Sequence, residues 1–375
     1  MAPDQANTVP RPLAGCRVLD LSLLLPGPYC TWLLAGFGAE VIKVEPPAGD
    51  PLRRMSPPLF TLMNRGKRSV TLDLKLDADR EALLRLVASA DMLIEGFRPG
   101  ALARMGLSVE LLQSRRPSLV VGSISGFGWS GPYRDRAAHD LNFLALAGYF
   151  AVPAQLEHVA ARPQVRLADM VAGQSAAIAL TMAWLQARAS GRGSHVDASI
   201  FDAIAGWTSP LMLATEPDAA PEQLGHVMAD SALYATSDGR HLSFGTLEDK
   251  FWQAFVAAVA DVAPELGDAR FAKRSGRDAH KRELAALLTA AIARRPLADW
   301  LARLQGVDTA VAPAYTGHEA LQDAQMRARG FVGTAADGLP ELHFPALFSG
   351  AMPASLGAAP TLGQDNESLL LENRA

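Results

Sequence analysis

The sequence has few cysteines and few charged residues, and each shortage excludes a class of protein. Its two cysteines, Cys16 and Cys30, cannot build a disulfide framework and have no partner at metal-ligand spacing. We expect both to be small buried residues, and we predict no metal site. Only 20% of the 375 residues are charged, with 35 Lys and Arg against 39 Asp and Glu. This near balance argues against a surface dedicated to nucleic acid.

Long apolar segments are also missing. Gly, Pro or charged residues interrupt each apolar stretch before it reaches the ~20 residues that span a bilayer. Residues 1–11 are polar and contain proline, unlike the basic and then apolar layout of a secretory signal. We therefore expect a cytoplasmic protein that binds no membrane. Because 49% of the residues are hydrophobic, the chain can bury a large core and divide into two domains.

Strand and helix patterns alternate along the first half of the chain. Short apolar runs predict strands at 18–21, 41–44, 70–74, 92–94 and 119–124, and helices are predicted at 29–37 and 79–88. We interpret Pro26-Gly27-Pro28 as a break before the first helix. The Ala-rich, charge-poor residues 168–189 predict a long buried helix that ends at Gly191, and an apolar helix is expected after Val196-Asp197. This alternation predicts an α/β domain with an open, mostly parallel, Rossmann-like sheet.

The pattern changes after residues 216–223, a segment rich in Pro, Asp and Ala that predicts a linker. Short strands are expected on both sides of a turn at residues 237–239, followed by helices at 250–260, 279–294 and 297–304. This part is typical of a small α+β domain. The predicted domains are a large α/β domain at residues 1–215, a small α+β domain at 225–310, and a C-terminal segment at 311–375 that returns to the large domain.

Residues 126–131 match the G-x-G-x-x-G pattern of dinucleotide sites. Pro132 and a polar run follow where that fingerprint needs a helix, and an acidic residue is missing at the distance of ~20 residues from which it would bind the ribose. We therefore interpret the motif as a glycine-rich turn that allows a close approach of the backbone.

Asp169, His139 and Glu248 are the titratable residues that we single out for chemistry. Asp169 stands just inside the start of the charge-poor helix, where a carboxylate either stabilises the positive helix end or acts as a catalytic acid. His139 is either a structural or a catalytic imidazole. Glu248 is either an ordinary helix-start residue or a functional acid. Spacing alone decides none of these alternatives.

Basic residues gather at positions 65–68 (RGKR) and at Arg98 with Arg104. Such runs are often solvated faces, but arginines also bind phosphate through two parallel hydrogen bonds. The alternatives are therefore a solvated surface and a site for a multiply phosphorylated ligand.

Several motifs together resemble the family III CoA-transferases, which include formyl-CoA transferase, and the alpha-methylacyl-CoA racemases that share their fold. The motifs are residues 15–21 (GCRVLDL), 26–28 (PGP), 38–47 (GAEVIKVEPP), 49–51 (GDP), 64–75 (NRGKRSVTLDLK), 97–100 (FRPG), 123–128 (SISGFG), 191–193 (GRG) and 196–197 (VD). Weaker similarity extends to about Pro313.

The resemblance implies an interlocked homodimer, in which each chain threads through the other, and an acyl-CoA substrate whose CoA lies against the large domain. It also implies that Asp169 is catalytic. In the transferases the aspartate attacks the acyl-CoA and carries the acyl group as a mixed anhydride. No cofactor is implied beyond the CoA moiety of the substrate. The residues implied to contact CoA are Lys43, Thr71, Leu72, Asp73, Leu74, Gly96, Phe97, Arg98, Arg104, Ala138, Asp140 and Phe143.

His139 favours the racemase branch. Residues 139–146 (HDLNFLAL) are similar to the racemases, which have a catalytic histidine at this position that the transferases usually lack. Inverting a carbon next to a thioester needs one group that removes a proton from one face and another that returns a proton to the opposite face. The resemblance gives these roles to His139 and Asp169, and makes Glu248 the acid that orients the imidazole. Backbone N–H groups at the start of the Asp169 helix are expected to stabilise the enolate.

Local differences separate this sequence from the racemases. Residues 170–173 (MVAG) replace a glycine-rich run, residues 230–232 (DSA) replace a longer loop with a Gly-Gly pair, and Pro46 stands where both branches often have an arginine. Residues 45–47 (EPP) are more like the transferases. The leading hypothesis is a racemase or epimerase of 2-methylacyl-CoA-type thioesters. A CoA-transferase acting between carboxylic acids is the alternative, and a CoA-binding protein without activity is a third. The sequence does not identify the acyl group.

Overall fold

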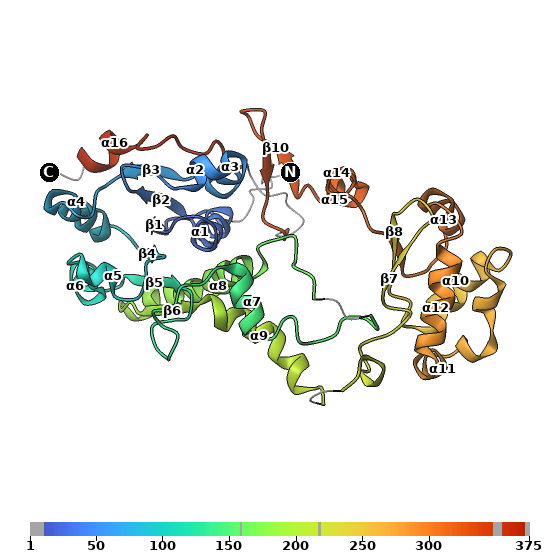
Figure 1. Ribbon diagram of the computed structural model, residues 1–375. Helices are drawn as coiled ribbons and strands as arrows, with labels where there is room; N and C mark the ends of the chain where they lie inside the picture. The colour runs from blue at the N-terminus through green and yellow to red at the C-terminus, as the bar shows by residue number, and fades with distance from the viewer. Residues whose placement is uncertain (1–10, 158–159, 217–218, 348–354, 372–375) are drawn as a thin grey trace, which may run out of the picture. The chain divides into compact units, whose positions relative to one another are not determined.

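The computed structural model describes residues 11–157, 160–216, 219–347 and 355–371. The chain forms two compact units (Figure 1). Unit 1 consists of residues 1–149, 162–208 and 323–375, and unit 2 consists of residues 150–161 and 209–322.

A six-stranded parallel sheet forms the centre of unit 1, with the strand order β3-β2-β1-β4-β5-β6. The strands are β1 (Arg17–Asp20), β2 (Glu40–Glu45), β3 (Arg68–Thr71), β4 (Met92–Glu95), β5 (Val120–Ser125) and β6 (His195–Ser199). The predicted α/β class with a parallel, Rossmann-like sheet is therefore confirmed. The order reverses between β1 and β4, and a parallel sheet opens a crevice at the carboxyl ends of its strands at such a point.

Helices flank this sheet. They are α1 (Pro26–Gly36), α2 (Leu52–Met55), α3 (Pro57–Asn64), α4 (Asp77–Ala88), α5 (Ala101–Arg104), α6 (Val109–Arg115), α7 (Asp140–Leu146), α8 (Leu167–Ser190) and α9 (Ile200–Leu213), with α15 (Ala324–Ala328) and α16 (Asn366–Leu371) near the C-terminus. A short antiparallel pair, β10 (Val332–Thr334) and β11 (Pro340–Leu342), also belongs to this unit. Apolar side chains of α4, α6 and α16 pack with those of the strands in one continuous core.

One local prediction was wrong and one strand was not predicted, while the helix expected after Val196-Asp197 is confirmed as α9. Pro26-Gly27-Pro28 does not break the chain before a helix but forms the first turn of α1, since proline tolerates the first helical positions, where no backbone N–H is needed. Val196 and Asp197 lie in β6, a strand that was not predicted. This strand has a polar and only half-buried sequence, HVDAS, because it is at the edge of the sheet.

Helix α8 was predicted as a long buried helix that ends at Gly191. It does end there, and Gly191 adopts a left-handed conformation with φ of 71°. Only one side of α8 is buried in the described chain, however. Ile178, Met182 and Leu185 are 58%, 57% and 49% exposed, and their spacing places them along one face.

The C-terminal segment covers the free edge of the sheet at β3. The backbone N–H groups of Ser69 and Thr71 donate to the side chains of Asp365 and Asn366, at 2.9 and 2.8 Å. These side chains take the place of a further strand, so β3 has no open donors at these two positions. In Figure 1, α16 accordingly lies beside β3.

Unit 2 is a small α+β unit. An antiparallel sheet of β7 (Leu233–Ala235), β8 (His241–Phe244) and β9 (Val311–Pro313) is joined by α10 (Asp249–Val259), α11 (Arg274–Ala279), α12 (Lys281–Ile292), α13 (Leu297–Leu304) and α14 (Gly317–Gln322). Short 3₁₀ helices lie at Pro221–Gln223, Pro264–Gly267 and Ala269–Phe271. Trp252 and Trp300 are the largest fully buried side chains of its core.

Within the described ranges, no helix is both long and apolar enough to cross a membrane. The same residues contain no cluster of His, Cys, Asp and Glu side chains suited to a metal ion. Cys16 and Cys30 are free and buried, as predicted.

Candidate active site

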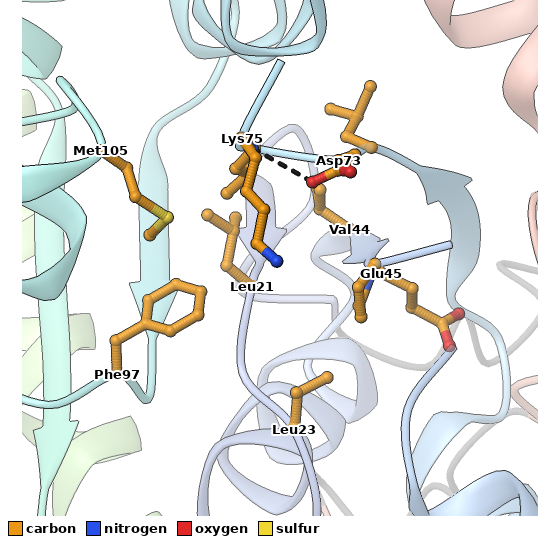
Figure 2. Close-up of a pocket in the computed structure, with 11 residues that line it drawn as sticks. Leu21, Leu23, Val44, Glu45, Asp73, Lys75, Phe97 and Met105 are labelled. Carbon is orange, nitrogen blue, oxygen red and sulfur yellow. Dashed lines mark hydrogen bonds between the residues drawn. The ribbon is translucent and has the colours of Figure 1, made fainter. Parts of the chain in front are cut away.

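A cavity of about 190 Å³ lies at the point where the strand order reverses. Its walls come from the carboxyl ends of β1, β2, β3 and β4 and from α5. Figure 2 shows Lys75 reaching into this space, with Phe97 and Met105 on one side and Val44 and Glu45 on the other. The lining is mainly apolar with a few polar groups at its rim, which is typical of sites that bind small organic ligands.

Residues implied to contact CoA are partly gathered at this cavity. Leu72, Asp73, Leu74 and Phe97 line it. Thr71 and Gly96 precede lining residues, Arg98 follows Phe97, and Arg104 precedes the lining residue Met105. A role of these residues in CoA binding stays a prediction. Sequence reasoning missed Lys75 as a lining residue, although it is the last residue of the 64–75 motif.

Arg98 and Arg104 are exposed cations beside the cavity. Neither forms an ion pair with any residue that the structure describes. The guanidinium groups of Arg104 and Arg134 lie 3.3 and 3.6 Å from the point where a Cβ atom on Gly100 would stand. Positive charge without a protein counter-ion therefore gathers near the turn after β4, where it is available to an anionic ligand.

Lys43 does not line the cavity. Its fully buried ammonium group pairs with Asp50 at 2.9 Å and donates to the carbonyl of Ser22 at 3.0 Å. These partners hold the loop after β1. Because a buried ammonium group is stable only with such partners, the Lys43 side chain has a structural role in this structure.

The other implied contacts, Ala138, Asp140 and Phe143, lie at α7. Phe143 is buried and packs against Phe127, with ring centroids 5.2 Å apart. Ala138 is half-buried and precedes His139. None of the three lines the cavity described above.

Asp140 joins α7 to the start of α8. Its buried carboxylate accepts hydrogen bonds through Oδ1 from the backbone N–H groups of Ala168, at 2.8 Å, and Asp169, at 3.3 Å. A carboxylate at this position satisfies donors that have no partner within the helix. This contact could not be predicted from the sequence, because it joins residues 28 and 29 positions apart.

Asp169 is held in an environment that favours its protonated form. Burial, followed by repulsion from the neighbouring Asp140, raises the pKa of Asp169 to about 6, while Arg166 lowers it. A carboxyl group with a pKa near neutrality can both release and accept a proton at physiological pH.

The backbone N–H groups predicted to stabilise an enolate are already in use, so that prediction was wrong. Asp140 accepts from residues 168 and 169, while the N–H groups of Leu167 and Met170 donate to the carbonyls of Val165 and Arg166, each at 3.0 Å. Satisfied donors cannot also receive a developing negative charge.

His139 immediately precedes α7 and is exposed in the described chain. Its backbone N–H donates to Oδ1 of Asn142 at 3.0 Å, which fixes the turn into the helix. Since Asp140 is bound to the backbone of Asp169, the structure brings the His139 and Asp169 segments together.

Gly173 sets how closely the Asp169 helix approaches α1. A Cβ atom at this position would stand 2.5 Å from the carbonyl oxygen of Pro26 and 2.9 Å from the ring of Tyr29. Any side chain here would push the two helices apart. The glycine that remains in residues 170–173 is therefore required by packing.

Glu248 belongs to unit 2, where it is the residue before α10. Its side chain is exposed, and its carbonyl accepts hydrogen bonds from the N–H groups of Phe251 and Trp252, at 3.0 and 3.2 Å.

The family model for CoA-transferase family III matches residues 13–366. The chain belongs to CoA-transferase family III. This family III chain is 34% identical to succinyl-CoA–D-citramalate CoA-transferase of Chloroflexus aurantiacus, over 97% of the chain and 94% of the relative. It is 29% identical to human alpha-methylacyl-CoA racemase, over 96% of the chain and 93% of the relative.

Solved structures of related proteins have the same fold as this family III chain. A CaiB/BaiF family protein from Brucella suis is 31% identical, with a TM-score of 0.83 over 96% of this chain and 99% of that one. The resemblance inferred from the motifs is therefore confirmed at the level of the family. The relatives include both transferases and racemases, so this family III chain is an enzyme homologue whose reaction the comparisons leave open.

Proposed function

We propose that the protein is an acyl-CoA racemase or epimerase that inverts the carbon next to the thioester of a 2-methylacyl-CoA-type substrate. The observation that carries this proposal is the bond between Asp140 and the backbone of Asp169, which brings the His139 segment beside the start of α8. His139 is adjacent in sequence to the residue that bonds to the backbone of Asp169, and the pKa of the Asp169 carboxyl group is raised to about 6. Inversion by proton transfer needs two such groups.

In the proposed reaction, one of the pair removes the α-proton and the other donates a proton to the opposite face. The electron pair of the broken C–H bond moves into the enolate and forms the new C–H bond. His139 starts as the neutral base when Asp169 starts protonated, and the roles exchange for the opposite enantiomer. Glu248 would fix the tautomer of the imidazole. No cofactor is proposed beyond the CoA moiety of the substrate.

CoA is proposed to bind at the carboxyl ends of the strands. Its adenosine part would lie in the cavity lined by Leu72 to Lys75 and Phe97, and its phosphates near the unpaired cations Arg98 and Arg104. The crevice at a change of strand order is the usual ligand site of such sheets.

The second candidate is a CoA-transferase, which the 34% identity to a transferase favours. Here the Asp169 carboxylate attacks the thioester carbonyl, the CoA thiolate leaves, and a mixed anhydride forms. With a pKa of about 6 the carboxyl group is mostly ionised at neutral pH, as this attack requires. The reaction consumes an acceptor acid and has no step for His139.

We also propose a homodimer in which the exposed apolar face of α8 is covered by a second chain. Ile178, Met182 and Leu185 form this face, and Trp207 of α9 is 60% exposed. The described residues of one chain leave this surface open to water, which is unusual in a stable monomer. An interlocked arrangement and a cytoplasmic location are part of the proposal.

Exchange of the α-proton in deuterated buffer separates the two reactions. We would follow 2-methylacyl-CoA by NMR with the native protein, with His139→Ala, with Asp169→Ala, and with His318→Ala as an exposed control. Exchange without an acceptor acid that requires both His139 and Asp169 supports the racemase. Absence of exchange in the native protein, together with acyl transfer to added carboxylates that survives His139→Ala, supports the transferase.

A further inference from the structure

Unit 2 contains a buried hydrogen-bond centre around the peptide that leads into Glu248. Glu248 follows β8 and the residues Gly245, Thr246 and Leu247, and it is the last residue before α10. The exposed carboxylate of Glu248 has a fixed direction only if the connection of residues 245–247 is rigid. The neighbouring Arg277 of α11 is 1% exposed, although arginine is rarely buried without partners.

All five N–H donors of the Arg277 guanidinium have acceptors. Nε donates to Oδ2 of Asp230 at 2.6 Å, and Nη1 donates to Oδ1 of Asp249 and the carbonyl of Phe271, each at 3.1 Å. Nη2 donates to the carbonyls of Thr246 and Leu247, at 3.5 and 3.0 Å. The planar group therefore holds residues on both sides of Glu248 at once.

Asp230 binds both Arg277 and the connection that leads into Glu248. Its carboxylate, which is 2% exposed as a residue, balances the charge of Arg277, and its carbonyl accepts the N–H of Thr246 at 2.9 Å. Asp230 therefore binds the connection directly and also through Arg277. This residue begins the segment 230–232 that differs from the racemases, so the altered loop still supports the Glu248 connection.

Arg274 adds a second, weaker support. Its backbone N–H donates to Oδ1 of Asp249 at 2.7 Å, and its Nη1 donates to the carbonyl of Leu247 at 3.4 Å. The acceptors reached by Arg274 and Arg277 of α11 therefore include residues 246, 247 and 249, in addition to Met228, Asp230 and Phe271. Residues 246, 247 and 249 among them lie on both sides of Glu248, so α11 restrains the peptide before and after this exposed acid.

We propose that Arg277, with Asp230, is a positioning residue for Glu248, which it acts on by fixing the backbone of residues 246–249. This inference rests on the role proposed for Glu248. The guanidinium does not touch the substrate in this proposal. It restricts the backbone rotation that decides where the Glu248 carboxylate points, and a misplaced orienting group lowers turnover more than substrate binding.

Arg277→Lys is the variant of choice, because lysine keeps the charge opposite Asp230 but has three donors instead of five. We expect the turnover number for α-proton exchange to fall at least tenfold, with KM for the acyl-CoA changed less than twofold. Faster hydrogen exchange is expected in the peptide of residues 245–252. Arg270→Lys is the control, since Arg270 also pairs with two acids, Asp268 and Glu283, but is 47% exposed.

A double-mutant cycle with Glu248→Gln distinguishes positioning from a general loss of stability. A residue that acts only through Glu248 should add little to the defect of Glu248→Gln, so the double variant should be as active as that single variant. If Arg277→Lys lowers turnover by the same factor in both backgrounds, or leaves the native turnover unchanged, the inference is wrong.

Asp230→Asn, which keeps the size of the side chain, gives an independent reading if Arg277→Lys folds poorly. It should reproduce the turnover loss and the faster exchange of residues 245–252, and normal values for both would overturn the inference. If Glu248→Gln is as active as the native protein, the role proposed for Glu248 fails and the inference fails with it. If Glu248→Gln is inactive while Arg277→Lys and Asp230→Asn are normal, only the inference fails.

Discussion

The Asp140 carboxylate accepts a hydrogen bond from the backbone of Asp169, so two acids share the start of one helix. One of them, Asp140, accepts hydrogen bonds from two N–H groups of α8. The other, Asp169, is left with burial and with a negative neighbour. A carboxyl group whose environment raises its pKa in this way is typical of the acids and bases of enzymes.

Asp140→Asn should lower the pKa of Asp169 from about 6, because the substitution removes the repulsion and keeps an oxygen to accept from the helix. The pH at which exchange activity falls on the acidic side should move down by the same amount. A pH profile of α-proton exchange measures this shift. An unchanged acidic limb in Asp140→Asn would contradict the electrostatic link, and Asp202→Asn, at an exposed acid of α9, serves as the control.

Asp169→Asn should stabilise the protein at pH 7.5 and not at pH 3.5. The folded-state pKa of about 6 lies above the ordinary value of 3.8, so the folded chain binds the proton more tightly. The free energy of unfolding therefore decreases as the pH rises from about 4 to about 6, by on the order of 1–3 kcal/mol. Urea unfolding at the two pH values measures the difference. Asp135→Asn, at an exposed acid, should have no such effect, and equal stability of Asp169→Asn and the native protein at pH 7.5 would refute the prediction.

Gly173→Ala should destabilise the protein, because the new methyl group would stand 2.5 Å from the carbonyl oxygen of Pro26. Forcing a methyl group into a closed helix contact costs ~1–3 kcal/mol. Gly206 of α9 is the matched control, since a Cβ there meets no atom within 4 Å. At that site alanine should instead stabilise the helix by ~0.5–1 kcal/mol. Thermal unfolding of both variants compares them, and equal shifts in Tm would count against the packing argument.

Lys67→Met should cost ~3–5 kcal/mol, because it leaves the buried carboxylate of Asp20 without its partner. Lys67 donates to Oδ2 of Asp20 at 3.1 Å, and both side chains are fully buried. Arg17→Met, which breaks the more exposed ion pair with Glu40, should cost ~0–1 kcal/mol. Denaturant unfolding of the two variants gives the comparison. A similar cost for both would mean that the Asp20 site is open to water.

Lys75→Met should weaken binding of CoA and make the remaining affinity less dependent on salt. The exposed ammonium group reaches into the cavity at the strand ends, where it can approach a phosphate. Isothermal titration with CoA at low and high salt measures both effects. Arg192→Met removes an equal charge at the far end of α8 and should change neither. If Lys75→Met and Arg192→Met bind CoA with the same affinity, the phosphates of CoA do not lie near Lys75.

The elements that could be predicted are those whose own residues have a clear apolar pattern. Strands β2 and β5 each contain three buried β-branched side chains, and α12 has a clear apolar periodicity. Strand β6 was not predicted because its sequence, HVDAS, contains no apolar run. Most of its residues are only partly buried. Pro26 was misread because proline both breaks helices and begins them.

The candidate site was predictable only as a set of residue types. Asp169 and His139 could be named from motifs, but the bond from Asp140 to the α8 backbone joins residues 28 and 29 positions apart across an irregular loop. No periodic pattern records such a contact. The same holds for the Arg277 centre, whose acceptors are mostly backbone carbonyls, and carbonyls have no signature in a sequence.

The C-terminal segment bonded to β3 also has a consequence for the order of synthesis. Asn366 and Asp365 reach strand residues that lie 295 and 296 positions earlier in the chain. Strand β3 leaves the ribosome long before these partners are synthesised. The backbone N–H groups at the edge of the nascent sheet therefore stay unpaired during most of translation. Completion of the chain then closes that edge. Premature termination upstream of Asp365 would therefore yield a polypeptide that keeps every strand of the sheet but leaves β3 free to pair with other chains.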